Sequence, residues 1–233
     1  MSSVETLERA DLTVLGLLPG ASNRTLLVTA GGSGPGSLAV YKPASGEAPL
    51  WDYSQGTLHR REAAAYEIAR ALGWPSVPAT VLREGPEGPG AVQAFVDAVP
   101  GEHFFSLREG RLADFRPFAL FDALINNGDR KGGHLLLGRD GQIWGIDHGV
   151  SLGVEPNLRT VIWEFAGDPI PGYLMRDVER VVGEVRSGEL GSHLAEILSA
   201  PEAEALRQRG HDLLETATFP EPGPERPFPW PLI

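Results

Sequence analysis

The chain contains 233 residues, of which 42% are hydrophobic and 22% are charged, a composition typical of a folded globular protein rather than a disordered one. Its formal net charge of −11 disfavours nucleic acid as a partner, because proteins gain affinity for phosphate backbones through Lys and Arg. The sequence has no cysteine, no basic-then-apolar leader and no apolar run near the ~20 residues that span a bilayer, so we expect a cytoplasmic protein without disulfides or membrane insertion.

The first half of the chain is predicted to form several strands and one helix. Short apolar runs rich in β-branched residues alternate with turns that contain Gly and Pro, which is the pattern of successive strands. The clearest helix is predicted for residues 57–72, because Gly73 and Pro75 follow it as stop signals. The expected strands are residues 12–18, 24–30, 37–42, 79–83 and 90–96.

The second half is predicted to be mainly helical around one hairpin. Residues 219–233 carry too many prolines for regular structure, and we expect this tail to fold back through Phe228, Trp230 and Ile233. With a boundary near Pro100-Gly101, the sequence predicts an α+β protein of two lobes, residues 1–97 and 98–233. The expected helices are residues 112–126, 173–187, 192–198 and 201–216.

Two charged residues lie on apolar faces of the predicted elements. Lys42 shares a strand face with Leu38 and Val40, the face expected to point inward. Glu62 lies on the apolar stripe of the helix that follows. Because desolvating either charge alone is costly, we expect the two side chains to pair. The alternative is that Lys42 extends to solvent while Glu62 only flanks the apolar seam.

A second constellation surrounds the predicted hairpin. Residues 134–137 and 142–146 are short apolar strands joined by an Asp-Gly turn, so the chain returns to its starting point. Asp129 precedes the first strand and Asp147 ends the second, which predicts that both carboxylates lie at the same end. Adjacent carboxylates repel each other unless a cation lies near them, which favours a divalent metal such as Mg²⁺. The alternative is that each Asp caps a turn of a purely structural hairpin.

The charged residues lie within segments that occur in a fixed order along the chain. These segments are Ala39-Val40-Tyr41-Lys42-Pro43, Arg61-Glu62-Ala63-Ala64-Ala65-Tyr66, Leu72-Gly73, Val77-Pro78, Asp129-Arg130 and Ile146-Asp147-His148-Gly149. Taken together, they resemble the phosphatidylinositol 3-/4-kinase-like branch of the protein-kinase-like superfamily, and its small actinobacterial members in particular, over residues 12–165. The resemblance implies a two-lobed protein-kinase-like fold, with an antiparallel sheet and one helix in the N-terminal lobe and a mostly helical C-terminal lobe that carries a catalytic hairpin.

The resemblance further implies an ATP- and Mg²⁺-dependent kinase that transfers the γ-phosphate to a hydroxyl of an unidentified protein, lipid or small molecule. Lys42, held by Glu62, would bind the α- and β-phosphates, and Asp147 would chelate the metal. Asp129 would orient or deprotonate the acceptor hydroxyl. Arg130 would stabilise the loop or the transferred charge, or else be a solvated surface residue.

Nucleotide contacts of two further kinds are expected from the same resemblance. The turn that contains Ser22 and Asn23 would cover the phosphates with backbone N–H groups. Adenine would lie between the lobes near Gln93, Phe95 and Val96, where backbone hydrogen bonds hold it.

His134 departs from the family pattern, because relatives usually place an Asn there as a second metal ligand. The departure allows a single-metal mechanism, a preference for Mn²⁺, a ligand from Asn126 or Asn127, or a degenerate site; His134 would otherwise be a strand histidine bonded to the backbone. One alternative function is therefore a nucleotide-binding pseudokinase. Another is a metal-dependent hydrolase, which leaves the pairing of Lys42 with Glu62 unexplained. Its Zn²⁺ ligands would be Asp129, His134, Asp147 and His148.

Overall fold

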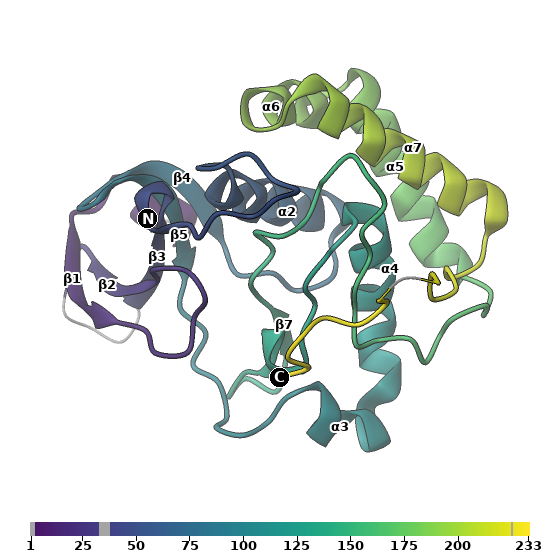
Figure 1. Ribbon diagram of the computed structural model, residues 1–233, viewed down its shortest axis with the longest axis horizontal. Helices are drawn as coiled ribbons and strands as arrows, with labels where there is room; N and C mark the ends of the chain where they lie inside the picture. The colour runs from purple at the N-terminus through teal and green to yellow at the C-terminus, as the bar shows by residue number, and fades with distance from the viewer. Residues whose placement is uncertain (1–2, 33–37, 225) are drawn as a thin grey trace.

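A five-stranded antiparallel sheet occupies one side of the molecule in the computed structural model, which describes residues 3–32, 38–224 and 226–233 (Figure 1). The strand order is β1-β2-β3-β5-β4. Each strand was predicted to within a few residues; the loop expected between the second and third strands lies largely outside the described residues, as does the expected start of the third strand at residue 37. The strands are β1 (Leu12–Leu17), β2 (Leu26–Ala30), β3 (Leu38–Pro43), β4 (Thr80–Gly85) and β5 (Gly88–Ala94).

The two faces of β3 have different environments. Ala39 and Tyr41 are fully buried in a small core that includes Leu7 of α1 (Ser3–Arg9), a helix that the sequence analysis did not predict. Lys42 lies on the opposite face, which is only half-buried. The face of Lys42 was expected to point inward; it is half-buried and borders a cavity, whereas the core of the sheet lies on the opposite face. The physical reason is that α1 covers the other side of the sheet, so the face of Lys42 is left to border a cleft.

The helical part of the chain is built around one large apolar core. Helix α2 belongs to this core through Ala65, Ile68 and Leu72, although it also contacts β4 and β5. None of the helices in the described residues combines the length and apolar content that crossing a bilayer requires. The helices are α2 (Leu58–Leu72), α3 (Phe104–Arg111), α4 (Arg116–Ile125), α5 (Gly172–Ser187), α6 (Glu189–Ile197) and α7 (Ala200–Thr216).

Two differences from the predicted helices have local causes. Helix α3 was not predicted. It begins at the buried Phe104, whose ring packs edge-on against that of Phe115. The helix expected over residues 112–126 is divided into a 3-10 turn and α4, with Pro117 in the first turn of α4. Proline fits this position because the first N–H groups of a helix have no intrahelical acceptor.

The predicted hairpin consists of β6 (Leu135–Leu137) and β7 (Ile143–Gly145). Leu135 pairs with Gly145, so the residues before β6 and after β7 meet at one end. The N–H of Ile146 donates to the carbonyl of His134 at 2.9 Å and extends this contact by one residue. The hairpin thereby brings the loop after α4 next to the segment after β7, as the sequence predicted.

The proline-rich tail folds back onto the helical part, but through contacts other than those expected. Phe228, Trp230 and Ile233 are 49%, 85% and 61% exposed. The anchors are main-chain groups instead: the carbonyl of Pro227 accepts from the N–H of Thr160 at 3.1 Å, and that of Leu232 accepts from the N–H of Gly132 at 2.7 Å. A chain with many prolines has few N–H donors, so its carbonyls make the attachment.

We predict that Ile68→Ala lowers the free energy of unfolding by about 2–5 kcal/mol, because it leaves a cavity in the core that α2 shares with the other helices. Urea unfolding followed by circular dichroism measures this change. Leu15→Ala, on the exposed strand β1, is the matched control and should cost less than about 0.5 kcal/mol. An equally small loss at Ile68 would contradict the packing of α2.

Candidate active site

A cavity of about 270 Å³ lies between the sheet and the helical part, and the four charged residues singled out in the sequence all line it. Lys42 comes from β3, Glu62 from α2, Asp129 from the loop after α4, and Asp147 from the segment after β7. These residues span 105 positions of the sequence between Lys42 and Asp147. Segments far apart in the sequence therefore meet at this cavity.

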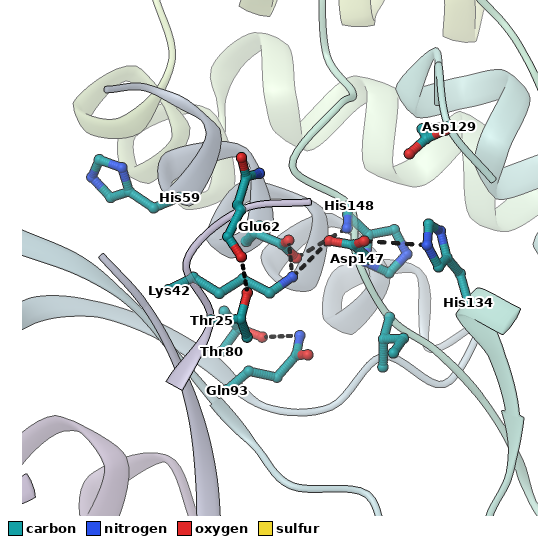
Figure 2. A network of polar contacts seen from close by, with 12 residues as sticks. Thr25, Lys42, His59, Glu62, Thr80, Gln93, Asp129, His134, Asp147 and His148 are labelled. Atoms are coloured by element: carbon teal, nitrogen blue, oxygen red, sulfur yellow. Dashed lines mark hydrogen bonds and ion pairs between the residues drawn. The ribbon is translucent and has the colours of Figure 1, made fainter. Parts of the chain in front are cut away.

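Lys42 pairs with two carboxylates at once. Its Nζ donates to Asp147 Oδ1 at 2.8 Å and also contacts Glu62 Oε1, and the Lys42 side chain is only 18% exposed (Figure 2). Glu62 is held from its other oxygen by the backbone N–H of His148, at 3.0 Å. The alternative in which Lys42 extends to solvent is therefore wrong. Helix α2, β3 and the segment after β7 are fixed to each other by this one cluster.

The pKa values in the cluster follow from this pairing. Burial by itself would lower the pKa of Lys42, but Asp147 and Glu62 together raise it well above its ordinary value. Burial would raise the pKa of Asp147, and Lys42 and His134 hold it well below the usual range of a carboxyl. Burial raises the pKa of Glu62, which the contacts with Lys42 and the His148 N–H oppose. Lys42 is therefore cationic and Asp147 anionic at neutral pH.

His134 contacts the second oxygen of Asp147. Its Nε2 lies 3.2 Å from Asp147 Oδ2 (Figure 2). Its Nδ1 accepts from the backbone N–H of Lys131 at 3.4 Å. An Nδ1 that accepts a hydrogen bond requires the proton on Nε2, so His134 donates to Asp147. Burial lowers the pKa of His134 to about 4, which keeps the ring neutral. His134 is therefore bonded to the backbone through Nδ1 and lies beside the carboxylate of Asp147 through Nε2.

Asp129 is positioned by its own loop. The side-chain oxygen of Asn127 accepts from the N–H of Asp129 at 3.0 Å, and Lys131 Nζ donates to Asp129 Oδ2 at 2.8 Å. The side chain is 27% exposed and lines the cavity. Burial raises the pKa of Asp129, the Lys131 ammonium opposes this shift, and the charge of Asp147 adds to it. A carboxylate with a raised pKa is a better proton acceptor than an ordinary one.

Arg130 is fully buried and does not line the cavity. Its guanidinium donates to both oxygens of Asp122, at 2.9–3.1 Å, to the carbonyl of Ile146 at 2.9 Å, and to His148 Nε2 at 2.8 Å. The interpretation of Arg130 as a solvated residue is therefore wrong, and contact with a transferred charge is not what the geometry supports. Arg130 instead ties α4 to the loop before β6 and to the segment after β7.

Asp122 is the residue that sequence reasoning missed. It lies within the apolar helix α4, is fully buried, and also accepts from Asn127 Nδ2 at 2.9 Å and from Thr160 Oγ1 at 3.1 Å. The available signal was a single carboxylate in an otherwise apolar helix, since a buried Asp requires a cation or several donors. Its partner was not recognisable, because Arg130 lies eight positions further along the chain and the intervening loop was of unknown shape.

The amides proposed as replacement metal ligands are already engaged elsewhere. The side-chain oxygen of Asn126 accepts from the N–H of Asn157 at 2.8 Å, and that of Asn127 accepts from the N–H of Asp129. Both residues are buried, at 2% and 0% exposure, and neither lines the cavity, so this alternative is wrong. The ring of His148 is likewise engaged elsewhere, because its Nε2 accepts from Arg130. Burial holds the pKa of His148 well below its ordinary value.

The four-ligand zinc site of the hydrolase alternative is consequently not formed, since His148 does not line the cavity and its Nε2 accepts from Arg130. In the described part of the chain, no three side chains of His, Cys, Asp or Glu converge in a metal-binding arrangement. Asp147, whose side chain is 46% exposed, instead offers one accessible carboxylate. That arrangement fits Mg²⁺ or Mn²⁺ held partly by phosphate oxygens and water, because these ions commonly use only one or two protein carboxylates.

The expected nucleotide contacts are divided between two cavities. Ser22 and Asn23 line the same cavity as Lys42, and Asn23 Oδ1 ties their turn to the N–H of Ala48 at 2.8 Å. Phe95 and Val96 line a second cavity, which shares no lining residue with the first and is bordered by the β6–β7 hairpin. Gln93 lies on the Lys42 face of the sheet, but it is 4% exposed and its amide donates to Thr80 Oγ1 at 2.9 Å (Figure 2).

Comparison with solved structures defines the class of protein. The Golgi casein kinase matches with a TM-score of 0.58 at 15% identity, covering 91% of this chain and 72% of that one. The Helicobacter pylori proinflammatory kinase CtkA matches with a TM-score of 0.56 at 14% identity, covering 91% and 94%. Hydra Fam20 matches with a TM-score of 0.56 at 15% identity, covering 92% and 87%. The chain therefore has a protein-kinase-like fold.

A curated relative defines the family. Protein Rv2133c of Mycobacterium tuberculosis is 40% identical over 258 aligned positions, which cover 96% of this chain and 92% of the relative. This chain belongs to the same family as Protein Rv2133c. A search of protein-family models found no match. The resemblance to the phosphatidylinositol 3-/4-kinase-like branch stays a prediction.

We predict that Arg130→Met lowers the free energy of unfolding by about 3–5 kcal/mol, because it leaves the charge of Asp122 buried without its cation. Chemical unfolding of Arg130→Met, of Asp122→Leu and of the double variant measures the coupling between the two positions. The double variant should recover part of the loss. Additive effects of the two single changes would contradict the assigned pairing.

The pKa of His134 predicts a stability that depends on pH. Its value of about 4 in the folded state lies below the ordinary 6.5, so the unfolded state binds more protons between these values and stability falls as pH drops through that window. In metal-free buffer, the free energy of unfolding should fall more between about pH 7 and about pH 4.5 in the parent than in His134→Asn. Equal losses in the two proteins would refute the neutral, buried assignment of His134.

Proposed function

We propose that this protein is an ATP- and Mg²⁺- or Mn²⁺-dependent phosphotransferase of the phosphatidylinositol 3-/4-kinase-like type. The nucleotide would bind between an N-terminal lobe, residues 1–97, and a C-terminal lobe, residues 98–233. The single observation that carries this proposal is the cluster of Lys42, Glu62 and Asp147 in one cavity with Asp129. A nucleoside triphosphate and its cation require such an arrangement, with a buried lysine for the phosphates and an accessible carboxylate for the cation.

Lys42 is the proposed phosphate-binding group. Its ammonium is cationic because two carboxylates raise its pKa. Glu62 holds the ammonium in place, and the backbone N–H of His148 holds Glu62. Asp147 would hold the metal, and a bound divalent ion would neutralise charge on the phosphate oxygens. The Golgi casein kinase, which shares the fold, has been solved with Mn and ADP bound. That structure supports nucleotide and metal as the ligands to test first.

Asp129 is the proposed proton acceptor. The acceptor hydroxyl would attack the γ-phosphorus, the bond between that phosphorus and the leaving oxygen of ADP would break, and the hydroxyl proton would pass to the carboxylate of Asp129. Lys131 donates to Asp129 at 2.8 Å, which fixes the orientation of the carboxylate while the other oxygen stays available. Arg130 has a positioning role in this proposal, through its contacts with Asp122 and with the Ile146 carbonyl.

Adenine is proposed to bind near the chain segment that connects the sheet to the helical part. Phe95 and Val96 lie on that segment, and Gln93 precedes them on the Lys42 face of β5. The turn of Ser22 and Asn23 would cover the phosphates in the cavity that it lines together with Lys42. A sequence without cysteine fits a reducing compartment, and we propose a cytoplasmic location.

A nucleotide-binding pseudokinase is the second candidate, and His134 is the observation that favours it. His134 donates to Asp147 where relatives are expected to supply an amide ligand. Such a protein would bind ATP and fail to turn it over. Binding and turnover therefore have to be measured separately.

We predict that Asp147→Asn abolishes metal-dependent ATP turnover, whereas Asp129→Asn retains ATP binding and lowers turnover by about a hundredfold to ten-thousandfold. Isothermal titration with Mg²⁺-ATP and with Mn²⁺-ATP gives the binding, and phosphate release or autophosphorylation gives the turnover. Asp114→Asn, at a surface residue paired with Arg111, is the matched control.

Three outcomes decide between the candidates. Turnover by Asp147→Asn equal to that of the parent would overturn the assignment of Asp147. Tight ATP binding by the parent without any turnover would favour the pseudokinase. An unmodified protein that does not bind ATP at millimolar concentration would end both nucleotide hypotheses.

A further inference from the structure

The C-terminal tail builds a groove directly beside Asp129. The carbonyl of Pro227 accepts hydrogen bonds from the N–H of Thr160 and from Trp163 Nε1, at 3.1 and 3.0 Å, and the carbonyl of Leu232 accepts from Gly132. Pro229 is buried between these two anchors. In Figure 1 the tail, in yellow, runs across the middle of the molecule and ends close to β7. The tail is therefore a fixed wall beside the loop that carries Asp129.

This groove has a volume of about 610 Å³, which is within the range of small-molecule sites. One side is formed by Gly128 and Asp129, and the tail supplies the apolar surfaces of Phe228, Trp230 and Leu232. Asp129 and Trp230 also line the central cavity, so the groove and the cavity meet at the proposed proton acceptor. A molecule lying in the groove would present a hydroxyl to Asp129.

Two arginines give the groove its charge. Arg159 and Arg226 both line it, and in the described residues neither forms an ion pair. The other cations near the site are already paired: Lys42 with Glu62 and Asp147, Lys131 with Asp129, and Arg130 with Asp122. The guanidinium groups of Arg159 and Arg226 are therefore not neutralised by a carboxylate of the described residues.

The aromatic surface of the tail is the second feature of the groove. Trp230 is 85% exposed and Phe228 is 49% exposed, and both line the groove. Exposed aromatic side chains next to arginines favour ligands that have both an apolar or aromatic body and an anionic group. Among the described residues that line the groove, the two arginines outnumber the one carboxylate, Asp129, so the net charge of the groove favours an anion.

We propose that this groove is the acceptor site, and that it selects small hydroxyl-bearing molecules with an apolar or aromatic body and a carboxylate or phosphate. The inference rests on the proposed phosphotransferase function. Arg159 and Arg226 bind the anionic group, Trp230 and Phe228 contact the body, and the hydroxyl lies at Asp129. In the transfer, the acceptor oxygen forms a bond to the γ-phosphorus, ADP leaves, and the hydroxyl proton passes to Asp129.

Three probes with one aromatic body and different charges test the groove without nucleotide. They are para-hydroxyphenylacetate, which is anionic, tyrosol, which is neutral, and tyramine, which is cationic. Binding is followed by the fluorescence of the tryptophans and by ligand-observed magnetic resonance. We expect the anion to bind about tenfold more tightly than tyrosol, and tyramine to bind most weakly.

Variants of the groove assign the preference to its residues. The double variant Arg159→Gln with Arg226→Gln should bind the three probes with nearly equal affinity, and Trp230→Ala should weaken all three. Arg60→Gln, at an exposed position of α2 outside the groove, is the matched control and should retain the parent's order. Unfolding midpoints of all variants establish that each is folded.

An order of affinities that the double variant leaves unchanged would overturn the proposal, as would equal binding of all three probes to the parent. Tighter binding of an acidic peptide, or of phosphatidylserine vesicles, in a manner that requires both arginines would also overturn the assignment to small molecules. Because these measurements contain no ATP, they are independent of turnover. If the parent protein shows no ATP turnover but keeps its order of affinities for the three probes, the phosphotransferase function is refuted and the anion preference is not.

Discussion

The pairing of Lys42 with two carboxylates is the interaction on which the architecture of the site depends. It joins a strand, a helix and the segment after the hairpin, three elements that otherwise belong to different parts of the fold. Glu62 satisfies the lysine within the folded protein, and Asp147 stays 46% exposed toward the cavity. The charges of the cluster therefore compensate one another within the protein, and part of the Asp147 carboxylate is accessible from the cavity.

A second buried ion pair stabilises the segments that carry the first. Arg130 and Asp122 are both fully buried, and their hydrogen bonds hold the Ile146 carbonyl and the His148 ring in place. The His148 N–H in turn orients Glu62. The chain thus positions its functional carboxylates through a continuous set of charged hydrogen bonds. Truncating one member of such a set leaves another charge buried without a partner, which is costly in a low-dielectric interior.

The likeness to protein kinases extends over most of the chain, at identities that establish the fold alone. Within that fold, α2 packs into the helical core rather than only against the sheet. The carboxylate of Glu62 is therefore carried by an element that the large core holds rigidly. The tail adds a feature that the sheet and helices alone do not provide, because it completes the surface beside Asp129.

The sequence by itself determined the strands, most of the helices and the charged residues that line the cavity. Periodicity and turn residues predicted all five strands, the helix at residues 57–72 and the hairpin, since these patterns are local. Lys42, Glu62, Asp129 and Asp147 stood out because a charge on an apolar face, or two carboxylates at one hairpin end, requires a partner.

Only the tertiary structure decided which face of β3 is buried, since that depends on α1 covering the sheet from the other side. It also decided that Arg130 is buried against Asp122, that Asn126 and Asn127 are structural, and that the tail lies beside Asp129. The physical reason is common to these cases: a side chain's burial and partners are set by segments distant in the sequence, whose approach no local pattern records.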